Sequence, residues 1–371
     1  PRPLVIAHRG ASGERPEHTM AAYRLAIAQG ADYIEPDLVM TSDGVLVCRH
    51  ENEISGTTDV ALRPEFAARR REKTVDGVTA AGWWVEDFTL VELKTLRCVE
   101  RLPRLRPANT AHNGQEEIPT FAEALALARE AGIGVYPELK HPTFLREQGL
   151  DPVPAFVETV RTGGGQAAAD RMFVQCFEVG PLLTLAQMSS LRWQCVQLIA
   201  ASGGPWDRPG TSCAEMIADP GLRAMRLELG ITAIGVEKSL IIPRDSAGRS
   251  LPPTDLITRA HRVGLAVHAW TFRAENIFLP QDLRCGEGDA AHGDLEVLIA
   301  AEPESGEIEG RPGQDLGRSL RRPDQEPRSG RQPSLEDHLA EGMPLQHVRN
   351  FMSQHPGNGE NIQALQDNRR L

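Results

Sequence analysis

Short apolar runs alternate with helix-like stretches over the first 300 residues of this chain, and this alternation restricts the possible folds more than any other feature. Several of the runs are continuously apolar, which is typical of parallel strands that are buried on both faces. Three of the helix-like stretches are followed by glycine, a residue at which helices commonly end. The predicted strands span residues 4–7, 33–40, 45–49, 134–139, 172–177, 193–199, 231–236 and 265–270.

Repeated strand–helix units over this length predict an α/β fold of the (β/α)8 TIM-barrel type, which takes about 250 residues. A doubly wound open sheet is the alternative. The glycine-rich GxGxxG turn that would support it is missing after the first strand. We therefore expect one barrel domain over residues 1–300.

Two regions depart from the alternation. Residues 51–117 form a long polar connection after the second strand, and we expect an insertion with short helices of its own, where barrel enzymes often build specificity. Residues 301–371 contain seven prolines, no lysine and no strand-like run. This composition predicts a polar, largely disordered tail.

Composition and charge exclude several classes of function. Forty basic and 51 acidic residues give a net charge of −11, which argues against a nucleic-acid binder that relies on phosphate neutralisation. No apolar run approaches the roughly 20 residues of a membrane-spanning helix. The chain starts at Pro1 without a signal peptide, as a processed product would. Its six cysteines are scattered, so they indicate neither a zinc site nor a disulfide framework.

The motif His8-Arg9-Gly10 ends the first predicted strand. In a parallel barrel the carboxyl ends of the strands face the active site. A histidine there can exchange protons near neutral pH, and the adjacent arginine can hold a phosphoryl oxygen. The alternative is a hydrogen-bonded structural histidine beside a surface arginine.

Glu35 and Asp37 lie two residues apart in the second predicted strand, so both carboxylates point to the same side. Two like charges held together are unfavourable unless a cation or a proton neutralises them. We therefore favour metal ligation over the alternative, in which basic residues of the barrel pair with both carboxylates.

Two further strand ends carry ionisable residues. His50 follows the strand at 45–49, and a turn at 42–44 would return it towards Glu35 and Asp37. A structural histidine is an equally good explanation for His50 alone. Glu138 and Lys140 end the strand at 134–139, where they would complete an oxygen-rich cation site and offset substrate charge, or form a plain structural ion pair.

These motifs together resemble the glycerophosphodiester phosphodiesterase family, and the longer bacterial type most closely. The resemblance rests on the HR pair at residues 8–9, the ExD pattern at 35–37 and the histidine at 50, and it runs from residue 4 to about 299. It implies a barrel, a Ca²⁺ cofactor with Mg²⁺ as the alternative, and a periplasmic or secreted location. It also implies a small-molecule glycerophosphodiester as the substrate, which is cleaved to glycerol 3-phosphate and an alcohol.

The resemblance also implies roles for particular residues. His8 and His50 would be the acid/base pair, and Arg9 and Lys140 would bind phosphate. Trp270 matches an aromatic residue near the substrate glycerol. The remaining matches, which would bind the metal, are Glu35, Asp37 and Glu138.

The chain departs from the family pattern at three places. Glu51 follows His50 where many members have Asp, and His18 stands where Asn is usual. After residue 296 the family's final strand is missing, so we expect an incomplete eighth strand. Two other functions remain as alternatives: a related barrel phosphodiesterase that acts on phospholipids, and an inactive binding protein that lacks the last strand.

Overall fold

A closed ring of strands forms the centre of the protein in a computed structural model that describes residues 4–188, 190–293 and 362–366. Neighbouring strands run parallel in the order β1, β2/β3, β7/β8, β9, β10, β11 and β12. The ring excludes the open doubly wound sheet and confirms the predicted barrel. The strands of the ring are β1 (Leu4–His8), β2 (Tyr33–Glu35), β3 (Asp37–Met40), β7 (Gly134–Val135), β8 (Glu138–Leu139), β9 (Phe173–Cys176), β10 (Gln194–Ile199), β11 (Ala233–Glu237), β12 (Ala266–Trp270) and β13 (Ile362–Gln366).

Prolines divide two of the predicted strands. Pro36 separates β2 from β3, and Pro137 lies just before β8. Proline has no backbone N–H to donate to a ladder, so regular pairing stops at each of these positions. Pairing resumes beyond the break, where the Glu138 amide donates to the Pro36 carbonyl at 3.0 Å. The divided strands therefore still occupy single places in the ring.

The predicted strand at 45–49 is shorter and lies outside the ring. It forms β4 (Leu46–Cys48), which pairs antiparallel with β3. The connecting turn is closed by the Thr41 amide, which donates to the Val45 carbonyl at 3.0 Å. This hairpin carries the chain back towards the carboxylate-bearing start of β3.

Residues 362–366 supply the eighth place in the ring. β13 pairs antiparallel with β1 on one side and with β12 on the other. The sequence predicted no strand after residue 300, and this part of the prediction was wrong. Without an eighth strand, β1 and β12 would each have one edge of unpaired backbone groups. Any extended segment can pair with these edges, so the local sequence of that segment does not need to show a strand pattern. Residues 301–361 and 367–371 of the predicted tail lie outside the described residues.

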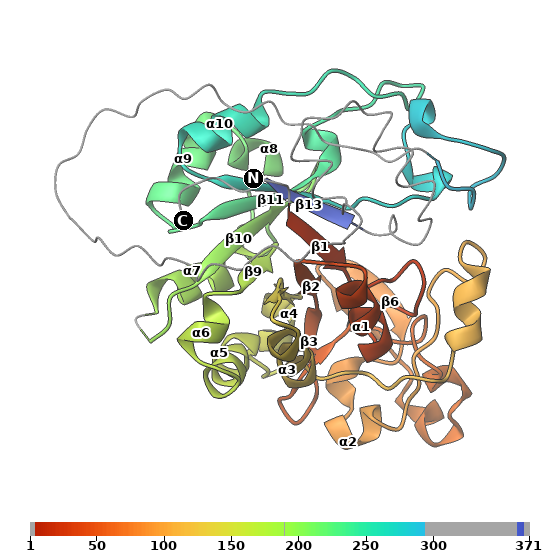
Figure 1. The fold of residues 1–371 in the computed structure, drawn as a ribbon. Helices are drawn as coiled ribbons and strands as arrows, with labels where there is room; N and C mark the ends of the chain where they lie inside the picture. Colours follow the sequence, from red (N-terminus) through yellow and green to blue (C-terminus); the bar gives the residue numbers. More distant parts are fainter. Residues whose placement is uncertain (1–3, 189, 294–361, 367–371) are drawn as a thin grey trace, which may run out of the picture.

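Helices cover the outside of the ring (Figure 1). Local sequence fixes their ends, as α3 (Phe121–Ala131) illustrates: Thr120 and Glu123 form a capping box, and Gly132 follows with a φ of 70°. No helix among the described residues is long and apolar enough to cross a bilayer. The other helices are α1 (Met20–Ala28), α2 (Leu90–Leu93), α4 (Pro142–Glu147), α5 (Pro152–Thr162), α6 (Gln166–Ala169), α7 (Val179–Gln187), α8 (Cys213–Met216), α9 (Asp219–Leu227) and α10 (Leu256–Arg262), with short 3-10 helices η1 (Val60–Leu62), η2 (Pro64–Arg69), η3 (Val85–Asp87), η4 (Pro107–His112), η5 (Lys238–Leu240), η6 (Asn276–Phe278) and η7 (Gln281–Leu283).

The segment at 51–117 has a core of its own. It contains α2, four of the 3-10 helices and an antiparallel hairpin, β5 (Arg71–Val75) and β6 (Val78–Gly82), which the sequence did not predict. Its buried apolar residues pack on the outer side of the β3–β4 hairpin and include Ile54, Phe66, Trp83, Phe88 and Leu96.

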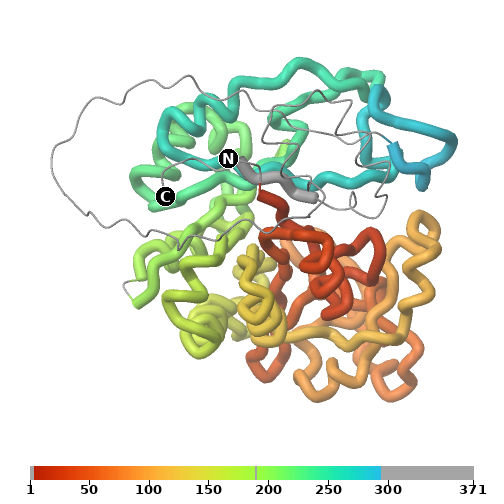
Figure 2. The backbone as a smooth tube through the Cα atoms, in the orientation of Figure 1, coloured from red at the N-terminus to blue at the C-terminus, as the bar shows by residue number. Residues whose placement is uncertain are grey.

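This segment also contacts the chain that follows β12. The two regions lie on the same side of the barrel (Figure 2). Arg106 donates to the Glu275 carboxylate at 2.5 Å and to the Ser12 carbonyl at 2.6 Å. These contacts fix residues 51–117 against the loop that carries the HR motif.

Candidate active site

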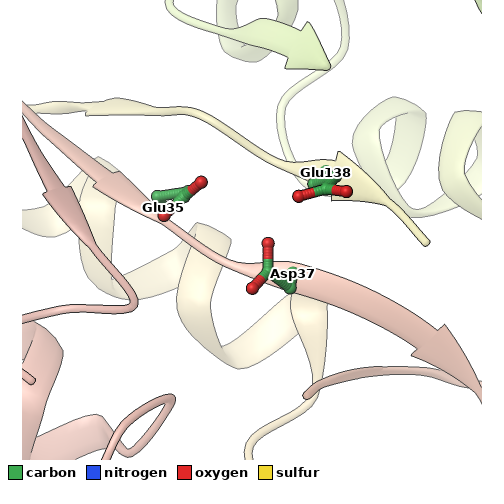
Figure 3. A group of neighbouring side chains, drawn as sticks. All are labelled: Glu35, Asp37 and Glu138. Atoms are coloured by element: carbon green, nitrogen blue, oxygen red, sulfur yellow. The ribbon is translucent and has the colours of Figure 1, made fainter. Parts of the chain in front are cut away.

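Three carboxylates meet inside the barrel at the breaks in its divided strands. Glu35 ends β2, Asp37 begins β3 and Glu138 begins β8. Asp37 and Glu138 are direct partners across two parallel strands. One oxygen of each carboxylate lies within 4.8 Å of the other two, and all three side chains are buried (Figure 3). The structure thus brings together the residues that the sequence predicted as metal ligands.

Three buried negative charges repel one another strongly. At 4.8 Å or less, each ionised pair costs at least about 3.5 kcal/mol for an effective dielectric constant of about 20. Burial, followed by the charges of Asp37 and Glu138, raises the pKa of Glu35 well above its usual value. Burial likewise raises the pKa of Glu138 to about 8, although Lys140 opposes the shift. The cluster therefore calls for added positive charge.

A hard divalent cation fits this donor set. All the donors are carboxylate oxygens, which Ca²⁺ and Mg²⁺ prefer. Asp37 Oδ1 is buried and has no hydrogen-bond partner, whereas Oδ2 accepts from His18 Nε2 at 2.9 Å. A buried acceptor without a partner is costly, and a bound cation would satisfy it.

His18 supports Asp37 by a hydrogen bond, a role that the sequence did not reveal. Burial opposes ionisation of Asp37, but the attraction and hydrogen bond of His18, together with His50 and Lys140, hold the Asp37 pKa well below its usual value. The ionised carboxylate requires a proton on His18 Nε2, so Nδ1 accepts from the Tyr23 hydroxyl at 2.8 Å. The only signal in the sequence was that His18 departs from the family pattern.

Replacing His18 should weaken cation binding. Outer-shell partners of ligating carboxylates typically contribute 10–100-fold to metal affinity, so we expect His18→Ala to raise the Ca²⁺ dissociation constant by about that factor in calorimetric titration. His18→Asn should lose less, because asparagine keeps an amide donor and tolerates the left-handed φ of 53° at this position. An unchanged affinity in His18→Ala would show that the contact does not support the site.

Gln175 is a second residue at the site whose role the sequence did not reveal. It lies in β9, next to Glu138 across the parallel pair. Its amide donates to Glu35 Oε1 at 2.7 Å and fixes the orientation of that carboxylate.

The two predicted catalytic histidines both line the pocket beside the carboxylates. His8 Nε2 lies 3.8 Å from Glu35 Oε2. Burial, followed by the charge of Arg9, lowers the pKa of His8 well below its usual value. Burial also lowers the pKa of His50 to about 3, assisted by Arg9 and Lys140. Both imidazoles are therefore neutral in this structure at physiological pH, and each can accept a proton.

The contacts of His50 define its tautomer. Nδ1 lies 2.5 Å from Glu51 Oε1, and hydrogen bonds from His50 and Arg101 help to hold the pKa of Glu51 low in spite of its burial. An ionised carboxylate only accepts, so the proton is on Nδ1. Nε2 then carries the lone pair and faces Lys140 Nζ at 3.3 Å. His50 is therefore oriented as a base.

Of the two predicted phosphate-binding residues, Arg9 lines the pocket and Lys140 does not. Arg9 lines the pocket, donates from its backbone to Glu35 Oε2 at 3.2 Å and from Nη1 to Glu17 Oε2 at 3.1 Å. Lys140 is not among the lining residues, and its ammonium instead lies 2.9 Å from Glu138 Oε1.

One wall of the pocket is apolar. Trp270, which the sequence predicted near the substrate, packs edge-on against Phe177 with ring centres 5.7 Å apart. The Trp270 indole donates to the Gly235 carbonyl at 3.0 Å, which fixes the ring at the end of β12. The pocket has a volume of about 90 Å³.

Known proteins are similar to this chain in sequence and in fold. Residues 8–293 match the Glycerophosphoryl diester phosphodiesterase family. Glycerophosphodiester phosphodiesterase GDPD6 of Arabidopsis thaliana is 36% identical over 292 residues, which are 75% of this chain and 76% of that protein. The glycerophosphodiester phosphodiesterase of Haemophilus influenzae is 34% identical over 216 residues, 53% of this chain and 57% of that protein.

A solved structure has the same fold. It is an Oleispira antarctica phosphodiesterase in complex with the product sn-glycerol-3-phosphate, which is 23% identical, has a TM-score of 0.51, and aligns over 73% of this chain and 85% of that one. The family match spans the ring from the end of β1 to β12 and every candidate site residue described above. This chain therefore belongs to the glycerophosphoryl diester phosphodiesterase family and is a phosphodiester hydrolase.

Proposed function

We propose that this protein hydrolyses glycerophosphodiesters, such as glycerophosphocholine or glycerophosphoethanolamine, to glycerol 3-phosphate and an alcohol with the help of one divalent cation. The observation that carries the proposal is the convergence of Glu35, Asp37 and Glu138 beside a pocket lined by His8 and His50. Ca²⁺ is the cation that we favour, and Mg²⁺ is the alternative.

The three carboxylates would hold the cation, which when bound supplies Lewis-acid polarisation of a phosphoryl oxygen. Arg9 would bind a second phosphoryl oxygen from the pocket wall and balance the charge that builds on phosphorus. Lys140 would bring a further positive charge through its contacts with Glu138 and His50.

The two histidines would exchange protons with the substrate. His50 would use Nε2, because Glu51 holds the proton on Nδ1. One imidazole would take a proton from the attacking hydroxyl while the other, after gaining a proton, donates to the departing alkoxide. Either histidine can be the base while the other is the acid. The attacking hydroxyl can be that of water or the one on the neighbouring glycerol carbon.

The pocket lining suits the glycerol phosphate part of a small diester. Arg9 offers a positive charge to the phosphate, and the Phe177–Trp270 wall offers an apolar surface to the glycerol carbons. We also retain the periplasmic or secreted location that the resemblance implies, which fractionation of cells that express the full-length gene would test.

An enzyme-coupled assay for glycerol 3-phosphate tests the substrate class. With Ca²⁺ present, we expect glycerol 3-phosphate release from glycerophosphocholine and glycerophosphoethanolamine. In a parallel assay of the released water-soluble headgroup, we expect rates at least about ten times lower with lysophosphatidylcholine or phosphatidylinositol. Faster turnover of either lipid would favour the phospholipid-directed alternative. Saturable binding of glycerophosphocholine without turnover would favour a binding protein.

A further inference from the structure

Arg101, in the inserted segment, joins two carboxylates that belong to different parts of the active site. Its Nη1 donates to Glu51 Oε1 at 2.8 Å, and Nη2 contacts the second oxygen of Glu51. Nη2 also donates to Glu17 Oε1 at 2.8 Å. The guanidinium is three-quarters buried, with 26% of its side chain exposed. One side chain therefore links the HR loop to the residue that follows His50.

Each carboxylate in turn holds a residue that we assign to the reaction. Glu51 accepts from His50 Nδ1 at 2.5 Å, which leaves Nε2 as the basic nitrogen. Glu17 accepts from Arg9 Nη1 at 3.1 Å, which limits the directions in which the Arg9 side chain can point. The chain of contacts thus runs from His50 through Arg101 to Arg9, with charges that alternate in sign.

The backbone around Arg101 is held firmly. The Val99 amide donates to the Thr57 carbonyl at 3.0 Å, and the Glu100 amide donates to Asn113 Oδ1 at 2.7 Å. Asn109 connects the Glu100 carboxylate, at 2.9 Å, to the Ser12 carbonyl of the HR loop, at 3.2 Å. These contacts place the guanidinium before substrate arrives, so no ordering of the loop is required at that moment.

We propose that Arg101 is a positioning residue through which the inserted segment orients His50 and Arg9 together for phosphodiester hydrolysis. The inference rests on the proposed roles of these two residues. It assigns a function to the insertion that goes beyond a general contribution to specificity. Loss of Arg101 would free both side chains and leave the Glu17 and Glu51 carboxylates without their shared cation near an anionic substrate.

Arg101→Gln tests the inference by steady-state kinetics with glycerophosphocholine at saturating Ca²⁺. We expect kcat/KM to fall about 10–100-fold, the range typical of outer-shell residues that orient the groups around a metal site. kcat should fall because His50 is no longer held in orientation, and KM should rise because Arg9 is no longer held in place to bind the phosphate. Arg101→Lys should recover only part of the loss, since an ammonium keeps the charge but lacks the planar fork that joins two carboxylates.

A double-mutant cycle and a matched control separate positioning from folding. The losses in Arg101→Gln and Glu51→Gln should be strongly non-additive, because both changes release His50. Arg63→Gln removes an arginine of similar exposure from the same segment, where it pairs with Asp59 at 2.9 Å. This control should keep wild-type kinetics, and all three variants should keep the calorimetric Ca²⁺ affinity.

Three results would overturn the inference: a kcat/KM within twofold of wild type in Arg101→Gln, additive losses in the cycle, or an equal kinetic loss in Arg63→Gln. If Arg101→Gln does not fold, Arg101→Lys decides the matter, and wild-type kinetics in that variant would refute the positioning role. Failure of the proposed function is a separate result, because it would appear as no turnover of glycerophosphocholine by the wild-type protein.

Discussion

Replacing His50 by alanine should lower kcat for glycerophosphocholine by about 10²–10⁴-fold, the range that one general acid or base contributes. The reason is geometric: His50 lines the substrate pocket, and Glu51 keeps the proton on Nδ1, which leaves Nε2 as the basic nitrogen. Calorimetric Ca²⁺ affinity should stay close to wild type, because His50 contacts none of the three carboxylates within hydrogen-bond distance. His8→Ala should lose activity in the same range, since His8 lines the same pocket.

His112→Ala provides the control for this pair. His112 lies in the same inserted segment, is partly exposed, and contacts Gln115 rather than the pocket. It should keep full activity. A wild-type kcat in both His8→Ala and His50→Ala would refute the acid/base assignment, whatever the state of the metal site.

Glu35→Gln should remove both activity and the response to cations. The substitution deletes one of three ligating charges, so we expect kcat/KM to fall at least about 10³-fold, equivalent to about 4 kcal/mol of transition-state stabilisation. In the cation-free protein, the same substitution should not lower the stability of the fold and is expected to raise it. Because burial and two neighbouring carboxylates raise the Glu35 pKa, its ionised form destabilises the fold, and neutral glutamine relieves the repulsion.

Thermal melting reports both effects. Ca²⁺ should raise the melting temperature of the wild-type protein, because it binds the folded state, and EDTA should reverse the shift and stop turnover. Glu35→Gln should melt at or above the cation-free wild type and show no shift with Ca²⁺. Glu158→Gln, at an exposed ion pair on α5, should behave as wild type. Full activity in EDTA or a preserved Ca²⁺ shift in Glu35→Gln would contradict the proposal.

The barrel was predictable because its strands and helices carry local patterns. Apolar runs marked the strands of the ring from β1 to β12, and strand ends share one face of a barrel, so Glu35, Asp37 and Glu138 could be placed together before any distance was known. His50 was predictable for a similar reason: a short turn returns β4 along β3. Each of these residues is placed in the site by the single strand or hairpin that carries it.

Other features depend on contacts between distant segments, which no local pattern shows. Arg101 meets Glu17 across 84 residues of sequence. β13 lies beside β1 and β12 because the ring has an open place, not because residues 362–366 have strong strand character. His18 looked like a departure from a family pattern, and only the fold places its ring against Asp37.

The most direct test of the central claim is an anomalous difference map from crystals soaked in Mn²⁺, at a concentration that restores activity after EDTA treatment. We predict one strong peak enclosed by the carboxylates of Glu35, Asp37 and Glu138, beside the pocket that His8 and His50 line. A peak at another place, or an empty carboxylate cluster in crystals of active enzyme, would contradict this account.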